Sequence, residues 1–312
     1  MSQRIGDYDC LTPLRTAGSG SARWCIGAYG VERFFIKQFL SPVYPADETT
    51  ALGQKQAARC RAFEKQKQAL YAAISCVIGG TLVPVIDFFR YDGRYYAVSE
   101  ALPDTHLTAE NARQLSPEER RRILFELALC LQRLHTQGVV HADLKPEHAL
   151  LCREANGWHT RLIDLDSGFL TDNPPREPRE MEGDPVYLSP EMYLSMCGQS
   201  VSLGPAADTF AFGMMIHRIW TGRLPDFDCQ KYDYLYQASL DGAAVRLDDS
   251  LPAQWRDTVQ AMLLPNPQDR PGDAQVTRLF EPAPTLAAGF ERNGPINGLS
   301  RFMRGEKRFE SR

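Results

Sequence analysis

The sequence has neither a long apolar run nor an excess of positive charge. No stretch approaches the roughly 18 consecutive apolar residues of a membrane-spanning helix, and the N-terminus lacks the basic end and apolar core of a secretory signal. Lys and Arg number 35 against 39 Asp and Glu, a net charge of −4, so no overall basic field is present to gather nucleic-acid phosphates. We expect a cytoplasmic protein that neither inserts into a membrane nor binds nucleic acid.

Paired cysteines and internal repeats are also missing. The eight cysteines are scattered without a Cys-x-x-Cys pair, so the sequence contains neither a zinc-ribbon nor a thioredoxin-type motif. They are predicted to be free thiols in a reducing compartment. What is present is 312 residues, of which 43% are hydrophobic, enough for one large domain or two lobes with separate cores.

The first third of the chain alternates short apolar runs with turn signals. Three runs have the pattern of strands: Arg33–Phe39, Leu82–Phe89 and Arg94–Val98. Between the first two lies the proline-free stretch Ala51–Ser75, predicted to be one helix with Phe63, Leu70 and Ile74 on a common face. We therefore expect a small antiparallel sheet that carries a single helix.

From Ser116 onward the sequence indicates helices. Ser116 is a good N-cap, Pro117 suits the first helical position, and Gly138 ends the predicted helix. Two more helices are expected over Asp208–Trp220 and Trp255–Leu264. The predicted fold class is α+β and bilobal, with a first lobe over residues 1–102, a larger and mainly helical lobe over 103–282, and a basic, flexible tail over 283–312.

Two segments carry the residues with catalytic potential. Val139–Leu151 has two apolar runs that flank a loop with Asp143 and Lys145, and about a dozen residues later an apolar strand ends in Asp164 and Asp166. Phosphoryl transfer needs such a set, since one acid accepts a hydroxyl proton, others hold Mg²⁺, and a cation balances the developing charge.

In this order and spacing, the motifs resemble those of the protein kinase superfamily, specifically the bacterial eukaryotic-like (Hanks-type) serine/threonine kinases. The matching segments are His-Ala-Asp-Leu-Lys-Pro-Glu from His141, Ile-Asp-Leu-Asp from Ile163 where the family has Asp-Phe-Gly, and the segment from Gly183 to Pro190-Glu191. The resemblance runs from about Leu11 to about Phe280 and implies a protein-kinase-like bilobal fold that binds ATP.

The resemblance implies a role for each matching residue. Asp143 would be the base or positioning group for the substrate hydroxyl, and Lys145 would lie beside the transferred phosphoryl group. Asp164 would bind Mg²⁺. Lys37 would hold the α- and β-phosphates and pair with Glu64, the one carboxylate of the predicted first helix.

The expected nucleotide site also includes a glycine-rich loop and a hinge. Gly18 and Gly20 match the first two glycines of Gly-x-Gly-x-x-Gly, but Arg23 stands in place of the third. The backbone amides of this loop would cover the phosphates, and the alternative is a plain Gly-Ser hairpin. The backbones of Glu100 and Leu102 would bind the adenine edge.

The expected metal site departs from the family pattern. His148 stands where the family has an asparagine that binds a second metal, and imidazole suits Mn²⁺ better than Mg²⁺. Asp166 is predicted to compensate, because carboxylates two residues apart on an extended chain with Asp164 point to one side. The alternative is that His148 only hydrogen-bonds the loop and a single metal site remains.

Other positions concern the scaffold and regulation. By analogy with the family, Asp208 would anchor the backbone of the catalytic loop, and Arg270 would form a buried pair with Glu191. Ala142 replaces the arginine that reads a phosphorylated activation loop, so activation by loop phosphorylation is not expected, although Thr171 and Tyr187 are possible acceptors. Asp184 replaces the usual threonine and is expected to pair with Lys145 in the resting state.

Three functions follow from this pattern. The first is an ATP-dependent serine/threonine protein kinase with Mg²⁺, or Mn²⁺ in its place, acting on protein substrates under the control of protein partners in bacterial signalling. The second is a pseudokinase scaffold, suggested by Arg23, His148 and Asp184. The third is a small-molecule phosphotransferase of the aminoglycoside or choline kinase type, although such enzymes generally lack the Pro-Glu and late Arg elements.

Overall fold

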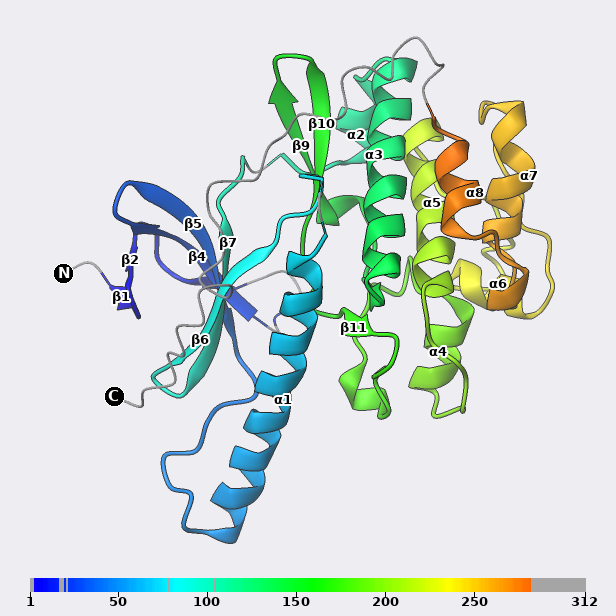
Figure 1. Cartoon of the computed structure of the whole chain (residues 1–312). Helices are drawn as coiled ribbons and strands as arrows, with labels where there is room; N and C mark the ends of the chain where they lie inside the picture. The colour runs from blue at the N-terminus through cyan, green and yellow to red at the C-terminus, as the bar shows by residue number, and fades with distance from the viewer. Residues whose placement is uncertain (1–2, 17–19, 21, 78, 104, 282–312) are drawn as a thin grey trace. The chain divides into compact units, whose positions relative to one another are not determined.

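A computed structural model describes residues 3–16, 20, 22–77, 79–103 and 105–281 of the chain. Among them, one compact unit comprises the residues of Met1–Cys76 and Val83–Leu102, and the other those of Val77–Leu82 and Pro103–Arg292. The predicted α+β class is confirmed (Figure 1). The predicted tail over 283–312 lies outside the described residues, and within them no helix is long and apolar enough to span a membrane.

The first unit is an antiparallel sheet of short and long strands, with one helix. Its strands follow the order β1-β2-β4-β5-β7-β6, with β3 also paired to β4. The elements are β1 (Arg4–Ile5), β2 (Tyr8–Cys10), β3 (Arg15–Thr16), β4 (Ala22–Tyr29), β5 (Glu32–Phe39), α1 (Ala51–Ser75), β6 (Val85–Tyr91) and β7 (Arg94–Glu100). The helix agrees with the predicted range. The second predicted strand begins three residues late, because Leu82 belongs to the other unit and bridges Leu162 there.

Each face of this sheet has its own hydrophobic layer. On one face, Cys25, Ile36 and Val98 are buried with residues of the β1-β2 hairpin. On the other face the layer is aromatic: the Phe63 ring of α1 lies 5.3 Å from that of Phe39 and 5.2 Å from that of Tyr95. The alternation of side chains along a strand separates the two layers.

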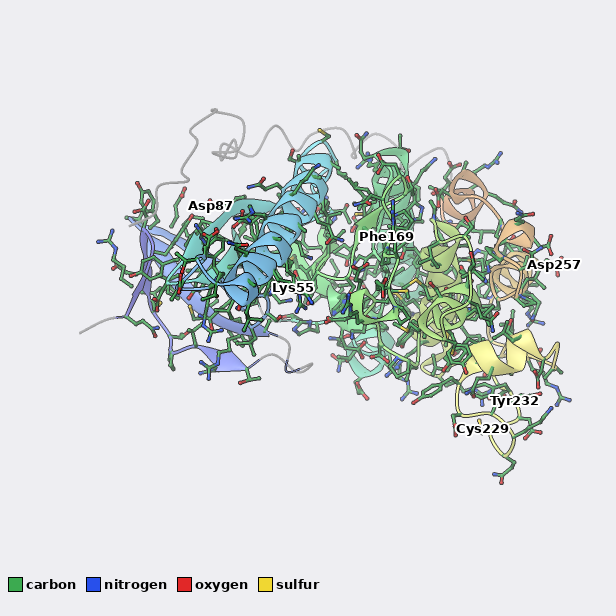
Figure 2. The ribbon with its side chains drawn as sticks, turned by 90° about the horizontal axis from the view of Figure 1, so that it is seen from below. Lys55, Asp87, Phe169, Cys229, Tyr232 and Asp257 are labelled. Atoms are coloured by element: carbon green, nitrogen blue, oxygen red, sulfur yellow. The ribbon has the colours of Figure 1, made fainter. Side chains whose placement is uncertain are left out.

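The second unit is mainly helical and also contains short strand pairs. Its helices are α2 (Ala109–Arg113), α3 (Pro117–Thr136), α4 (Pro190–Met196), α5 (Ala206–Thr221), α6 (Leu235–Leu240), α7 (Ala253–Met262) and α8 (Asp273–Arg278). Its strands are β8 (Val139–Val140), β9 (Ala149–Glu154), β10 (Gly157–Leu162) and β11 (Phe169–Leu170), and one-turn 3₁₀ helices span Pro146–His148, Pro178–Glu180 and Pro267–Asp269. Figure 2 labels Phe169 of β11, and Cys229 and Tyr232 of the loop between α5 and α6.

Helix α3 is the centre of this unit. Ser116 caps its N-terminus by accepting a hydrogen bond from the backbone of Glu119, and Pro117 takes the first position, as predicted. After it, Gly138 has φ 70°, a conformation that glycine adopts with little strain. The predicted stripe is buried, namely Ile123, Leu127, Leu131 and Leu134. Helix α3 packs against β10 on one side and against α5 and α8 on others.

A buried ion pair ties the loop after α7 to the start of α4. The Arg270 guanidinium donates two hydrogen bonds to the Glu191 carboxylate, at 2.7 and 2.8 Å, and its Nε donates to the backbone oxygen of Leu264. The two side chains are 0% and 3% exposed. The predicted pair is therefore confirmed, and all three nitrogens of the guanidinium donate hydrogen bonds.

Replacing Arg270 should reveal how strongly the unit depends on this pair. Arg270→Met leaves the Glu191 carboxylate buried without its partner, so we expect the free energy of unfolding to fall by about 3–5 kcal/mol. Urea titration followed by circular dichroism measures this change. The control Arg278→Met removes an exposed arginine of α8 and should change it by less than about 0.5 kcal/mol. Equal, small effects of both variants would contradict the prediction.

Candidate active site

The loop that carries Asp143 is held in place by one buried carboxylate. Asp208, 1% exposed at the start of α5, accepts hydrogen bonds from the backbone amides of His141 at 2.7 Å and Ala142 at 2.9 Å. Ala142 has φ 65°, an unfavourable region for a residue with a Cβ. The two hydrogen bonds compensate for this strain, so the predicted anchoring role of Asp208 is confirmed.

A histidine from α3 completes this anchor. His135 contacts Asp208 through Nε2 at 3.0 Å and Asp273 of α8 through Nδ1 at 2.8 Å. Burial by itself lowers the pKa of His135, but the two carboxylates outweigh it and raise the pKa to about 9. A charged imidazolium therefore links three helices to the loop at neutral pH.

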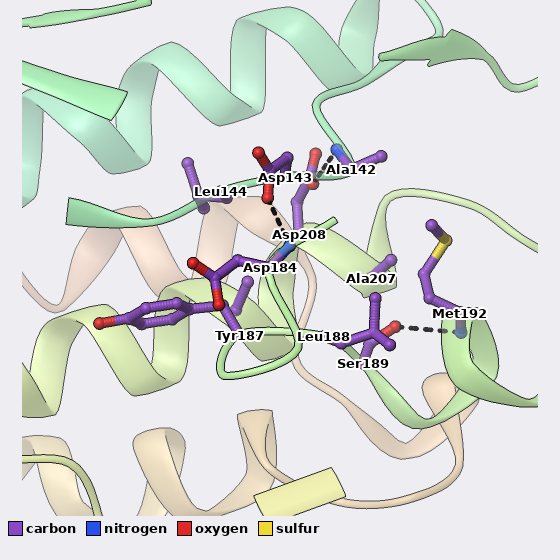
Figure 3. Close-up of a pocket in the computed structure, with 11 residues that line it drawn as sticks. Ala142, Asp143, Leu144, Asp184, Tyr187, Leu188, Ser189, Met192, Ala207 and Asp208 are labelled. Atoms are coloured by element: carbon purple, nitrogen blue, oxygen red, sulfur yellow. Dashed lines mark hydrogen bonds between the residues drawn. The ribbon is translucent and has the colours of Figure 1, made fainter. Parts of the chain in front are cut away.

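Asp143 lies where the loop meets the segment before α4. Its Oδ1 accepts a hydrogen bond from the backbone amide of Asp184 at 2.8 Å (Figure 3), and its Oδ2 lies 3.4 Å from the ammonium of Lys145. The carboxylate side chain is 15% exposed. It is thus fixed at one oxygen and partly open to solvent, two features that the role predicted for Asp143 toward a substrate hydroxyl requires.

Lys145 contacts two carboxylates at once. Its Nζ lies 3.4 Å from Asp143 and 3.4 Å from Oδ2 of Asp184, whose Oδ1 accepts a hydrogen bond from the backbone of Val186. Burial lowers the pKa of Lys145, but the two negative charges more than offset this and the pKa lies above its usual value. The expected pairing of Asp184 with Lys145 is present.

A small pocket opens beside Asp143 and Asp184 (Figure 3). The rest of its lining is mostly apolar and comes from the loop, the segment before α4, α4 and α5: Leu144, Leu188, Met192, Ala207 and Ala211. Tyr187 also lines it, but this residue is only 5% exposed and its hydroxyl accepts a hydrogen bond from Arg218 at 2.7 Å. Tyr187 is therefore not positioned as a phosphorylation site, whereas Thr171 is exposed.

His148 lies between Asp143 and Asp164. Its Nδ1 hydrogen-bonds the backbone oxygen of Asp143 at 2.7 Å, and its Nε2 lies 3.7 Å from Oδ2 of Asp164. Burial lowers the pKa of His148, and this effect exceeds the opposing attraction of Asp164. The hydrogen bond to the loop agrees with the simpler alternative given for this residue.

The backbone around Asp164 is not extended. Asp164 has φ 63°, and the backbone amide of Asp166, which lies in a turn, donates to Oδ1 of Asp164 at 3.4 Å. The assumption that both carboxylates point to one side of an extended strand is therefore wrong, and a metal role for Asp166 stays a prediction. Among the described residues, no three His, Cys, Asp or Glu side chains form a cage for an ion.

The predicted nucleotide residues lie in the first unit. Lys37 lies on β5, opposite Ala97 of β7, while Glu64 of α1 accepts a hydrogen bond from the hydroxyl of Tyr95 at 2.7 Å. Burial, and then this hydrogen bond, raises the pKa of Tyr95. No local pattern of residues indicates this contact, because it depends on how α1 lies across the sheet.

The remaining residues of this set fall on loops and a strand end. Gly20 has φ 71° in the connection between β3 and β4, a conformation that favours glycine, whereas Gly18 lies outside the described residues. Glu100 ends β7 opposite Phe34 and is exposed, and Leu102 follows it at the end of the unit.

Comparison with known proteins identifies the class. A family model described as "Protein kinase domain" matches residues 63–279, more than half of the chain. The chain therefore belongs to the protein kinase domain family. The matched range contains Asp143, Lys145 and Asp164, and begins after Lys37 and the glycine-rich segment.

Particular relatives refine this assignment. The chain is 29% identical over 202 residues to the mouse hormonally up-regulated neu tumor-associated kinase, covering 62% of this chain and 27% of that protein. It is 29% identical over 177 residues to the serine/threonine-protein kinase PkaA of Streptomyces coelicolor, covering 56% and 31%, and 29% over 192 residues to kin-29 of Caenorhabditis briggsae, covering 61% and 22%. The aligned segments thus span under a third of the length of these relatives.

The charged His135 makes the stability of the second unit depend on pH. Its pKa of about 9 in the folded protein exceeds the ordinary value of 6.5, so its contribution is complete below pH 6.5 and is lost as the pH rises to 9. We expect this loss to be on the order of 3 kcal/mol in the free energy of unfolding. Denaturant titrations at pH 6 and pH 9 measure it.

Asp273→Asn is the informative variant for this prediction. It removes one of the two charges that stabilise the imidazolium and leaves the Asp208 anchor intact. The fall in stability between pH 6 and pH 9 should be clearly smaller than in the wild type. Because other groups titrate alike in both proteins, parallel pH curves would contradict a charged His135.

Proposed function

We propose that the protein is an ATP-dependent serine/threonine protein kinase. The observation that carries this proposal is the position of Asp143. In a chain of the protein kinase family, its carboxylate is fixed by the Asp184 amide, lies 3.4 Å from an ammonium, and belongs to a loop anchored by Asp208. Serine/threonine kinases among the relatives support the choice of acceptor.

In the proposed reaction, the acceptor hydroxyl oxygen forms a bond to the γ-phosphorus of ATP while the bond from that phosphorus to the oxygen of ADP breaks. Asp143 would take the hydroxyl proton, and the ammonium of Lys145 would balance charge on the transferred phosphoryl oxygens. The raised pKa of Lys145 keeps it charged for this role at neutral pH.

Nucleotide and metal binding complete the proposal. Lys37 and the backbone amides near Gly18 and Gly20 would hold the phosphates, and the backbones of Glu100 and Leu102 would bind adenine. Asp164 supplies hard carboxylate oxygens that suit Mg²⁺, an ion that proteins commonly hold with one or two carboxylates plus phosphate oxygens and water. Asp166 or His148 would add a ligand, the latter favouring Mn²⁺. The metal would neutralise phosphate charge.

The wider setting belongs to the same proposal. We expect protein substrates and regulatory protein partners, in bacterial signalling like that suggested by the similarity to the Streptomyces kinase. All eight cysteines are free thiols, which favours the reducing cytoplasm.

Autophosphorylation tests the proposal directly. The full chain, supplied with γ-labelled ATP and either Mg²⁺ or Mn²⁺, should incorporate label, and Asp143→Asn should lower the rate by roughly 10²- to 10⁴-fold because it removes the proton acceptor. Absence of label in the wild type with either ion would instead favour the pseudokinase scaffold. ATP turnover with an amino alcohol or a sugar, but not on protein, would favour a small-molecule phosphotransferase.

The Lys145–Asp184 contact should restrain this activity. Asp184→Thr removes one of the two carboxylates that contact the ammonium and leaves its contact with Asp143, while the backbone amide that holds Asp143 is kept and a hydroxyl can still accept from Val186. Since partly exposed ion pairs contribute about 0.2–1 kcal/mol, we expect the initial rate of autophosphorylation to rise by up to about fivefold. Glu182→Thr, a change at an exposed neighbouring acid, should have no effect. A slower Asp184→Thr enzyme would show that the acid assists the reaction.

A further inference from the structure

Two stacked aromatic residues on the sheet of the first unit have no part in the functions above. The rings of Trp24 on β4 and Phe35 on β5 have centroids 5.4 Å apart and planes 23° apart. Both residues are half-buried. By contrast, Phe39 of the same strand is 7% exposed, and its ring lies 5.3 Å from that of Phe63 on α1. The stacked pair therefore keeps part of its surface accessible, outside the layer that holds the helix.

The pair lies on the face of the sheet from which Lys37 projects. Trp24 is directly opposite Lys37 in the β4–β5 ladder, and Phe35 precedes Lys37 by two residues on β5. Residues directly opposite each other, and residues two apart on one strand, point to the same side of a sheet. Since Lys37 is proposed to hold the phosphates, the two rings lie on the face proposed for the nucleotide.

The same face continues onto the strand that leads to the proposed hinge. Phe35 is directly opposite Ser99 of β7, and the next residue, Glu100, is the last of that strand. Neighbouring strands lie about 4.8 Å apart. A base bound by the backbones of Glu100 and Leu102 would therefore lie one strand away from Phe35.

A flat and partly accessible pair of rings suits a nucleobase. Every base has a π-face that stacks on aromatic side chains, whatever its pattern of hydrogen-bonding groups. The guanidinium of Arg15, an exposed residue opposite Trp24 on β3, lies 5.8 Å from the Trp24 ring. A cation–π contact at an exposed site is weak, so a base can take the place of this guanidinium.

We propose that Trp24 and Phe35 form a stacking platform for the base of the nucleotide. This inference rests on the proposed nucleotide binding, and it names the part of the ligand that the two rings recognise. Stacking on the rings would add to the contacts that the hinge backbone makes with the edge of the base. The inference does not depend on phosphoryl transfer.

The affinities for ADP and adenosine test this role, because both ligands carry the base and only one carries phosphates. They are measured by calorimetric titration of the full-length chain in the presence of Mg²⁺. Trp24→Leu should weaken the binding of both ligands by the same factor, about tenfold, whereas Trp24→Phe keeps a ring and should stay within about threefold of the wild type. Tyr29→Leu changes an exposed aromatic residue on the opposite face of β4 and should match the wild type.

Tryptophan fluorescence reports the contact directly. The chain has four tryptophans, and a base stacked on Trp24 should quench part of their emission as ADP is added. Trp24→Phe, which should still bind ADP, should lose this quenching. A side chain that only stabilises the sheet would not produce such a difference.

Three results would overturn the inference. The first is unchanged or tighter binding of both ligands to Trp24→Leu. The second is a loss of affinity for ADP alone, which would indicate a disturbed phosphate site. The third is the same quenching in Trp24→Phe as in the wild type.

Failure of the proposed function gives different results. If the wild type binds neither ligand, the proposed nucleotide binding fails, and the inference fails with it. If Asp143→Asn and the wild type both bind ADP but neither transfers phosphate, the kinase proposal fails while the platform remains supported by the Trp24 variants.

Discussion

The second unit depends on the carboxylate of Asp208. This buried group accepts two backbone hydrogen bonds from the loop before Asp143 and contacts the charged His135. Without it, the left-handed backbone at Ala142 would lose the hydrogen bonds that hold it. Since Asp143 follows directly, the position of the proposed base is set by an acid from another helix. Chemistry at Asp143 is thus linked to the stability of the whole helical unit.

In the first unit, the aromatic layer between α1 and the sheet holds the helix in place. Phe63 contacts Phe39 and Tyr95. The Lys67 ammonium lies over the rings of Phe39 and Phe63, and the Tyr95 hydroxyl donates a hydrogen bond to Glu64. The ring faces compensate part of the cost of desolvating the Lys67 ammonium, and the Tyr95 hydroxyl does the same for the Glu64 carboxylate. The layer therefore determines which charges α1 presents, in addition to holding the helix.

Local signals predicted the elements well. The helix over Ala51–Ser75, the cap at Ser116 and the buried stripe of α3 agree with the prediction, because capping and 3.6-residue periodicity are properties of neighbouring residues. Two local predictions failed. Leu82 left the expected strand to bridge Leu162, and Asp164 adopted a left-handed conformation instead of an extended one. Leu162 is far from Leu82 in the sequence, so no local pattern indicates that bridge, and a left-handed conformation is uncommon for a residue with a Cβ.

The sequence by itself determined the class of protein and the identity of the residues around the proposed reaction, because catalytic motifs need particular side chains at fixed spacing. It also indicated the pairs Arg270–Glu191 and Lys145–Asp184 through resemblance. Only the tertiary structure decided the partners of other buried or half-buried charged groups. Asp273 contacts His135, Tyr95 donates a hydrogen bond to Glu64, and the Phe39 ring lies near the Lys67 ammonium. These contacts set pKa values and burial, which depend on distances in space that residue order alone does not encode.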